Sequence, residues 1–223
     1  MRKLLLAPLK AEFSILSHAF QKKWKHESLQ IQSHTALYFP EVDLYLAVGG
    51  LGKVDMALKT QFWLSHISGC KLMACVGSAG SLDGSLKLGD IIVASKTVEH
   101  DFKQIFFKKP LPEFPMGGAW NDVLQLSQNP HIHHAPIASG DEDILSAERR
   151  RELFKLTGAQ AVAWEGAGAA RACAFLKIPY CEIRGITDDL SWDLTSNLKQ
   201  DFTKNLNHAM LKVADWLLLV CVN

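Results

Sequence analysis

The apolar positions of this chain fall into short continuous runs that alternate with segments of helical length and spacing. Continuous apolar runs of five to ten residues are typical of strands buried on both faces of a sheet. Such runs occupy residues 4–8, 72–76, 90–99, 135–139 and 178–186, and two or three further strands are expected within 30–48. Helices are expected at about 11–25, 54–67, 119–127, 147–155, 165–176 and 199–220.

This alternation predicts an α/β fold with three layers, α/β/α, around a largely parallel or mixed central sheet. No linker, repeat or low-complexity segment interrupts the pattern, so residues 1–223 are expected to form a single domain. Hydrophobic residues make up 48% of the 223 positions, which suffices for one substantial core.

The net charge and the cysteines of the chain limit its possible binding partners and its cellular compartment. The formal net charge is +1, which argues against binding to nucleic acid or to an anionic membrane surface. The five cysteines are odd in number and include no Cys-x-x-Cys pair, a pattern that indicates buried thiols in a reducing compartment. With no segment resembling a signal peptide or a bilayer span, we expect a cytoplasmic protein.

The stretch 162–190 carries the most distinctive group of polar residues. Glu165 begins a predicted helix, and Arg184, Thr187, Asp188 and Asp189 cluster at the end of the strand that follows. In open α/β sheets, ligands bind beyond the carboxyl ends of the strands, so these residues form a candidate reaction site. A structural alternative is that Arg184 and an aspartate merely pair to cap the strand.

Two glycine-rich segments, 49–55 and 77–85, follow predicted strands. Glycines at such positions let backbone amides approach a ligand, although a tight turn also requires them. Neither segment matches the phosphate-cradling or dinucleotide-binding patterns. Ser78 places a hydroxyl at the tip of the second predicted turn. Glu12 follows the first strand, where it could alternatively be an exposed carboxylate in the first turn of a helix.

Seven motifs occur in an order and spacing that resemble one family. They are APLKAEF at 7–13, GLGKVDMAL at 50–58, GSAGSLDGSLKLGDIIVAS at 77–95, His100-Asp101, SGD at 139–141, WEGAG at 164–168 and IRGITD at 183–188. Together they resemble the purine nucleoside phosphorylase and nucleosidase superfamily, particularly the bacterial 5′-methylthioadenosine/S-adenosylhomocysteine nucleosidases. The resemblance runs nearly from end to end and implies a nucleoside phosphorylase-like fold.

The resemblance also implies a role for each candidate residue. Asp188 matches the acid that protonates or hydrogen-bonds purine N7. Glu165 matches the carboxylate that binds the ribose hydroxyls, and Glu12 matches the residue that activates the attacking water. Ser78 and Arg184 match groups that hold this water or, in phosphorylases, the phosphate. The expected partner is therefore a small-molecule nucleoside, with no cofactor and no metal.

The chain departs from the family pattern around the expected base and sugar subsites. After SGD the family commonly has a small residue and a stacking aromatic, whereas this chain has Glu142 and Asp143. Trp164 replaces a methionine beneath the sugar, and Ala163 replaces a frequent acidic residue. We expect Asp143, Ile144 and Trp164 to contact substrate, and these departures leave the base and the 5′ substituent open.

The choice between water and phosphate depends on the first strand–helix loop. The phosphorylases bind phosphate with arginines, one of them in this loop, whereas residues 7–13 contain Lys10 and Glu12 but no arginine. A carboxylate repels phosphate, so hydrolysis is favoured. The alternatives are a phosphate-dependent phosphorylase, a hydrolase of a futalosine-type nucleoside, and a non-catalytic nucleoside-binding domain.

Two further segments have a structural interpretation. His131, His133 and His134 lack accompanying ligands at metal-site spacing, so a surface loop is expected there. The aromatics of segment 102–118 could form a lid, and large uncovered aromatics usually mark an interface. Because the family's equivalent segment caps the neighbouring subunit's site, we expect a homodimer with residues 102–118 at or near that site.

Overall fold

The computed structural model describes residues 1–104, 106–124, 129–188 and 198–221. Its strands are β1 (Lys3–Ala7), β2 (Glu27–Ile31), β3 (His34–Phe39), β4 (Leu44–Val48), β5 (Leu72–Ser81), β6 (Ile91–Glu99), β7 (Glu113–Pro115), β8 (Ile132–Ser139), β9 (Ala161–Ala163) and β10 (Tyr180–Asp188). Its α-helices are α1 (Lys10–Lys23), α2 (Gly52–His66), α3 (Ala119–Leu124), α4 (Ala147–Thr157), α5 (Gly166–Leu176) and α6 (Leu198–Val220). Most of these elements lie close to their predicted ranges.

The described strands form one mixed sheet in the order β10-β6-β8-β9-β5-β1-β4-β3-β2, with β7 paired to β6. Strand β10 also pairs with β5, so β5, β10, β6, β8 and β9 close a ring. Strand β10 is parallel to β5 and antiparallel to β6. The predicted α/β class with a mixed sheet is therefore confirmed, whereas the three-residue strands β7 and β9 were missed because they are too short to show periodicity.

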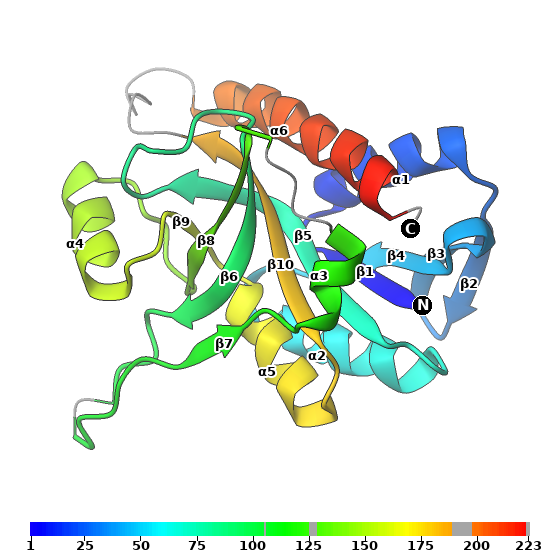
Figure 1. The fold of residues 1–223 in the computed structure, drawn as a ribbon, viewed down its shortest axis with the longest axis horizontal. Coiled ribbons are helices and arrows are strands. Elements are labelled where there is room, and N and C mark those ends of the chain that lie inside the picture. Colours follow the sequence, from blue (N-terminus) through cyan, green and yellow to red (C-terminus); the bar gives the residue numbers. More distant parts are fainter. Residues whose placement is uncertain (105, 125–128, 189–197, 222–223) are drawn as a thin grey trace.

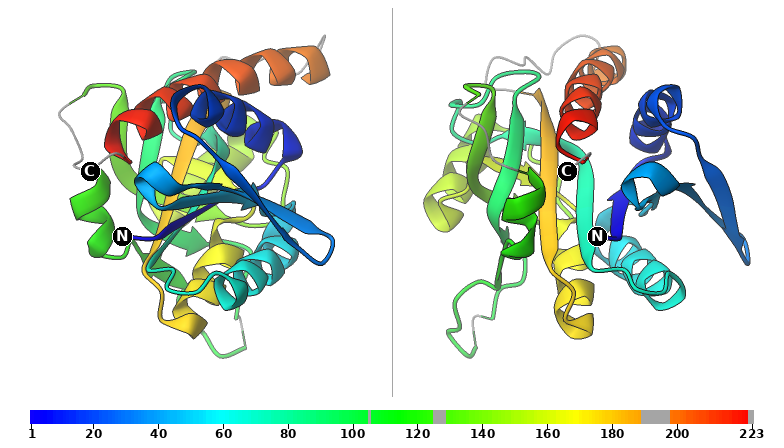
Figure 2. Two further views of the ribbon diagram at one scale, coloured as in Figure 1. Left: turned by 90° about the vertical axis from the view of Figure 1, so that its right-hand side faces the viewer. Right: turned by 45° about the vertical axis from the view of Figure 1, so that its right-hand side comes forward.

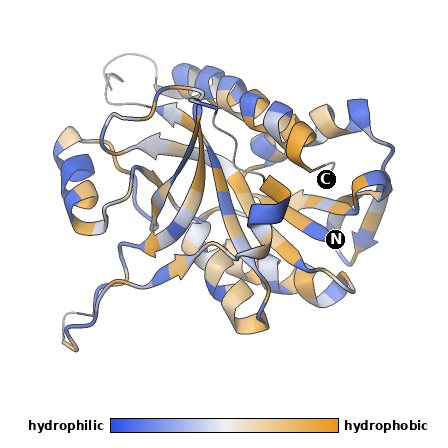
Figure 3. Cartoon of the chain, in the orientation of Figure 1, coloured by the Kyte–Doolittle hydropathy of each residue, from blue (hydrophilic) through white to orange (hydrophobic). Residues whose placement is uncertain are grey.

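Helices cover both faces of the extended part of the sheet (Figures 1 and 2). Along β1, Leu5 and Ala7 belong to the core that includes buried residues of α1 and α6. Leu4 and Leu6 belong to the opposite core, which includes residues of α2 and α5. This arrangement follows from the alternation of side chains along a strand. Figure 3 shows the apolar strands enclosed between amphipathic helices.

Strand β5 is longer than predicted, because residues 77–81 continue the strand instead of forming a turn. Gly77 and Gly80 pair with Arg184 and Asp188 of β10. A Cβ atom added at Gly77 would lie 2.8 Å from Arg184 Nη1, and one added at Gly80 would lie 2.7 Å from Asp188 Oδ1. These glycines therefore make room for functional side chains within the sheet, and Ser78 lies on a strand.

The histidines at 131–134 also differ from the prediction of a surface loop, because His133 and His134 belong to β8. The Asp90 carboxylate lies 2.9 Å from His131 Nδ1 and 3.3 Å from His133 Nε2. Within the described ranges, no group of three or more His, Cys, Asp or Glu side chains is arranged to hold a metal ion. None of the described helices combines the length and apolar character needed to cross a bilayer.

Candidate active site

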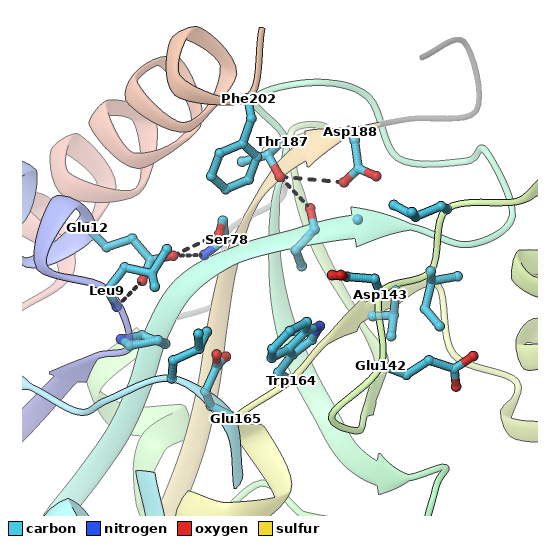
Figure 4. A pocket seen from close by; sticks show the side chains of 18 residues that line it. Leu9, Glu12, Ser78, Glu142, Asp143, Trp164, Glu165, Thr187, Asp188 and Phe202 are labelled. Atoms are coloured by element: carbon cyan, nitrogen blue, oxygen red, sulfur yellow. Dashed lines mark hydrogen bonds between the residues drawn. The ribbon is translucent and has the colours of Figure 1, made fainter. Parts of the chain in front are cut away.

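A cavity of about 350 Å³ opens where β1, β5 and β10 end (Figure 4). This volume lies at the lower end of the range for small-molecule sites. Seven of the eight sequence-predicted site residues line it: Glu12, Ser78, Asp143, Ile144, Trp164, Glu165 and Asp188. The eighth, Arg184, lies behind the wall of the cavity, where it packs with Glu12 against the backbone of Gly77. Predicted residues as far apart in the sequence as Glu12 and Asp188 thus meet at one site.

Glu12 is a buried carboxylate held by three hydrogen bonds. Its Oε1 accepts from the backbone amide and the hydroxyl of Ser78, both at 2.8 Å, and its Oε2 accepts from the amide of Leu9 at 2.8 Å. Only 1% of Glu12 is exposed, so the alternative of an exposed first-turn carboxylate is wrong. Burial raises the pKa of Glu12 above its usual value, against the opposing effect of the Arg184 charge.

Arg184 is surrounded by acidic side chains. Its Nε donates to Glu182 Oε1 at 2.8 Å, its Nη2 donates to Glu165 Oε2 at 3.2 Å, and its Nη1 donates to the carbonyl of Ser78 at 3.3 Å. Burial opposes the charge of Arg184, but the neighbouring acids hold its pKa well above the usual range. The Arg184 guanidinium therefore already forms ion pairs with two carboxylates of the protein itself.

Glu182 is a further residue of the site that was not predicted from the sequence. Its side chain is completely buried beside Arg184. Besides Arg184, it accepts hydrogen bonds from the Thr97 hydroxyl at 2.5 Å and the Tyr180 hydroxyl at 3.3 Å. A glutamate within an otherwise apolar strand, two positions before an arginine, was the available sequence signal. Residues i and i+2 share one face of a strand, so the pair could have been expected to meet.

Glu165 lies at the N-cap of α5, but its side chain makes no capping hydrogen bond. Instead, its Oε1 accepts from the amide of Gly52 at 3.4 Å, and its Oε2 binds Arg184. The hydroxyl of Ser139 fixes the preceding backbone, since it donates to the carbonyl of Trp164 at 2.7 Å and accepts from the amide of Ala167 at 2.8 Å. The Trp164–Glu165 segment is thus positioned by the end of β8, the start of α2 and Arg184 of β10.

Three of the sequence motifs are joined in a polar cluster beside the cavity. Lys53 Nζ binds Asp101 at 2.6 Å and Glu99 at 3.0 Å. Asp141 Oδ1 accepts from the amide of Lys53 at 2.9 Å, and the amide of Asp141 donates to Asp101 Oδ2 at 3.0 Å. The GLGK, His-Asp and SGD motifs therefore hold the loops of the site together.

Asp188 lies at the end of β10, and its side chain is 15% exposed. Its Oδ2 forms an ion pair with Arg150 Nη2 at 2.5 Å. The structural alternative in which Arg184 and an aspartate cap the strand is therefore wrong for Asp188, because Arg184 pairs with Glu165 and Glu182. Asp189, the other candidate in this segment, lies outside the described residues.

The two acids that follow SGD have different environments. Glu142 forms a two-oxygen ion pair with Arg149, each bond 2.7 Å long, and this hydrogen bonding lowers the pKa of Glu142. Asp143 is exposed, and Figure 4 shows its carboxylate turned toward the cavity near the indole of Trp164. Phe202 of α6 covers the opposite side of the cavity. The wall of the cavity at Phe202 is therefore aromatic, whereas the wall at Asp143 carries a carboxylate.

Buried carboxylates around a partly apolar cavity, at the strand ends of a mixed sheet, define an α/β enzyme for a small polar ligand. The chain belongs to the phosphorylase superfamily, whose family model matches residues 4–220.

Curated relatives and solved structures agree with this assignment. The 5′-methylthioadenosine/S-adenosylhomocysteine nucleosidase of Mycobacterium bovis is 30% identical over 175 residues, which cover 64% of this chain and 68% of the relative. The aminodeoxyfutalosine nucleosidase of Helicobacter pylori strain J99 is 31% identical over 166 residues, covering 70% and 71%.

Among solved structures, the chain is similar to a 5′-methylthioadenosine/S-adenosylhomocysteine nucleosidase from Helicobacter pylori bound to butyl-thio-DADMe-Immucillin-A. The TM-score is 0.83 at 25% identity, with 99% of this chain and 97% of that chain covered. A futalosine hydrolase of H. pylori strain 26695 gives the same values. The predicted nucleoside phosphorylase-like fold is confirmed.

Proposed function

We propose that this protein hydrolyses the N-glycosidic bond of a purine nucleoside of the methylthioadenosine/adenosylhomocysteine type, releasing the free base and a 5-substituted ribose. The observation that carries this proposal is the pair of carboxylates on two sides of one cavity. Glu12 is buried among hydrogen-bond donors at one side, and Asp188 lies at the other (Figure 4). The relatives named nucleosidases support the same reaction class.

The reaction requires an acid on the base side and a water-activating group on the sugar side. The bond from C1′ to the purine breaks through an oxocarbenium-like sugar, whose positive charge a nearby carboxylate stabilises. Asp188 protonates purine N7, so that a neutral base departs. Glu12, aligned by Ser78, removes a proton from the attacking water, and Glu165 binds the ribose hydroxyls. Each acid–base group contributes a factor of about 10²–10⁴ in rate.

Water is the proposed nucleophile because the charges behind the cavity disfavour phosphate. Arg184, the group that would bind phosphate in a phosphorylase, is already bonded to Glu165 and Glu182, and it packs close to Glu12. A phosphate dianion would have to enter beside these buried acids, and like charges there disfavour its binding. Phosphorolysis is the second candidate, and a requirement for phosphate would establish it.

Which base and which 5′ substituent the enzyme prefers depends on Asp143 and Trp164, two positions near the cavity where this chain differs from the family pattern. A polar base wall formed by Asp143, and a flat apolar surface provided by Trp164, differ from the stacking aromatic and the methionine common in the family. A futalosine-type nucleoside is therefore the alternative substrate class, and two of the relatives described above carry futalosine activities in their names.

The proposal includes a homodimer in the cytoplasm. Phe106 and Phe107 are 90% and 68% exposed in segment 102–118, and residues 106–112 of this segment extend away from the body of the molecule in Figure 1. Val54 and Leu58 of α2 are also largely exposed. These apolar side chains support a subunit contact with segment 102–118 at or near the neighbouring site. The buried, free thiols of all five cysteines support a reducing compartment.

A panel of nucleosides tests the proposed function. The purified protein is incubated with methylthioadenosine, adenosylhomocysteine, a futalosine-type nucleoside, adenosine and inosine, with and without phosphate, and the free base is quantified by chromatography. Asp188→Asn serves as the inactive control. Base release without phosphate, together with a 5-substituted ribose, supports hydrolysis. Formation of a ribose 1-phosphate only when phosphate is present would show a phosphorylase, and absence of base release from every nucleoside would refute the proposal.

A further inference from the structure

One buried cation near the cavity has no role in the reaction proposed above. Arg150 lies on α4, is 6% exposed and is not among the residues that line the cavity. Its Nη1 donates to the carbonyl of Ser81 at 2.8 Å, and its Nη2 forms the ion pair with Asp188 Oδ2. Arg150 thus connects the ends of β5 and β10 to a helix that packs outside the ring of strands.

This two-point attachment fixes the orientation of the Asp188 carboxyl group. The terminal torsion of an aspartate is broad, so an unrestrained carboxyl group samples many orientations. In the structure Oδ2 is bonded to Arg150, while Oδ1 lies 3.5 Å from the hydroxyl of Thr187, a residue that lines the cavity. A guanidinium held by a backbone carbonyl is a rigid partner for such a group.

Helix α4 also begins directly after the loop that carries Asp143 and Ile144. The side chain of Ser146 caps this helix by accepting from the amide of Arg149 at 3.1 Å. The loop on the base side of the cavity and the proposed acid are therefore attached to the same helix, the acid through Arg150. A base seated against this loop would meet the acid at a fixed distance.

We infer that Arg150 is a positioning residue, which holds Oδ2 of Asp188 so that Oδ1 faces N7 of a purine seated against the loop. The inference rests on the proposed function. In the step concerned, Asp188 is protonated when the nucleoside is bound, its proton moves to N7, and the electron pair of the C1′–N9 bond moves onto the base. The step leaves Asp188 as a carboxylate, the form that pairs with the guanidinium of Arg150 in the structure.

The neighbouring arginines provide a matched control. Arg151 is exposed and follows Arg150 directly on α4, so Arg151→Met removes the same side chain from the same helix without touching the site. Arg149 is unsuitable because it pairs with Glu142 of the cavity lining. Arg150→Met removes the charge and both hydrogen bonds. Arg150→Lys keeps the charge but lacks the planar guanidinium whose two nitrogens reach the Ser81 carbonyl and Asp188 Oδ2.

The experiment measures kcat and KM for base release by wild type, R150M, R150K, R151M, D188N and the double variant D188N/R150M. We expect R150M to lose about 10–100-fold in kcat with KM nearly unchanged, the effect of misplacing a reacting group. The loss of kcat should be smaller for R150K, and R151M should have the kcat of wild type. Guanidinium ion at millimolar concentration should restore part of the activity of R150M. In the D188N background, R150M should cause no further loss.

Two results would overturn the inference: a full additional loss from R150M in the D188N background, or an R150M variant as active as R151M. If R150M does not fold, the R150K variant tests the inference instead. A kcat of R150K equal to that of wild type would then refute the positioning role of Arg150. Failure of the proposed function has a different signature, because wild type itself then releases no base from any nucleoside, and the inference is refuted with it.

Discussion

The substitution Glu12→Gln separates catalysis from binding, because it removes a charge with little change in shape. In the structure, the two Glu12 oxygens accept three hydrogen bonds, two from Ser78 and one from the amide of Leu9. The glutamine carbonyl can keep the two bonds from Ser78, but its amide group then faces the Leu9 amide, and two donors meet. A buried donor left without an acceptor costs about 1–3 kcal/mol in the free energy of unfolding.

The loss of activity should be much larger than this structural cost suggests. If Glu12 removes the proton of the attacking water, a neutral amide cannot replace it, and kcat should fall by about 10²–10⁴. The pH dependence follows from the same role. Glu12 acts as an ionised base, and burial raises its pKa above the usual carboxyl value. Wild-type activity should therefore decline as the pH falls toward that raised value, and the decline should begin above the ordinary carboxyl range.

Calorimetry with an uncleavable nucleoside analogue, alongside chromatographic assay of base release, measures the two properties independently. Glu12→Gln should bind the analogue with an affinity near that of wild type while releasing almost no base. Glu27→Gln, at an exposed position on β2, is the matched control and should retain full activity. A Glu12→Gln variant that binds nothing would show that Glu12 has a structural or ligand-contacting role, and one that keeps a tenth of the activity would place the base elsewhere.

Three further substitutions test the other proposed roles. Asp188→Asn should lower base release by about 10²–10⁴ while the fold persists, and retention of more than a tenth of the activity would point to another acid, first of all Asp189. Glu165→Ala should raise KM for ribose substrates, whereas equal turnover of ribose and 2′,3′-dideoxyribose substrates by wild type would contradict a contact with the hydroxyls. Asp143→Phe should shift the ratio of kcat/KM toward adenine nucleosides about tenfold, which corresponds to ~1.4 kcal/mol, and an unchanged ratio would show that Asp143 faces solvent.

Much of the fold could be predicted from the sequence because the relevant signals are local. Apolar runs and helical spacing gave the class of fold and most element ranges, since burial on both faces of a strand leaves a pattern within five to ten residues. The exceptions have local causes as well. Residues 161–163 are too few to show a period, and the glycines at 77 and 80 suggested a turn where the strand β5 in fact continues.

The sequence by itself also determined which residue types belong to the site, through the motifs that contain Ser78, Glu165 and Asp188. Only the tertiary structure decided how these residues are paired. Besides its neighbour Glu182, Arg184 bonds to Glu165 rather than to Asp188, and Asp188 bonds to Arg150, 38 positions earlier in the chain. Partner choice depends on which strands and helices become neighbours and on how fully each charge is buried. Neither the neighbourhood of the elements nor the burial of a charge can be recognised from the residues that flank the charged residue in the sequence.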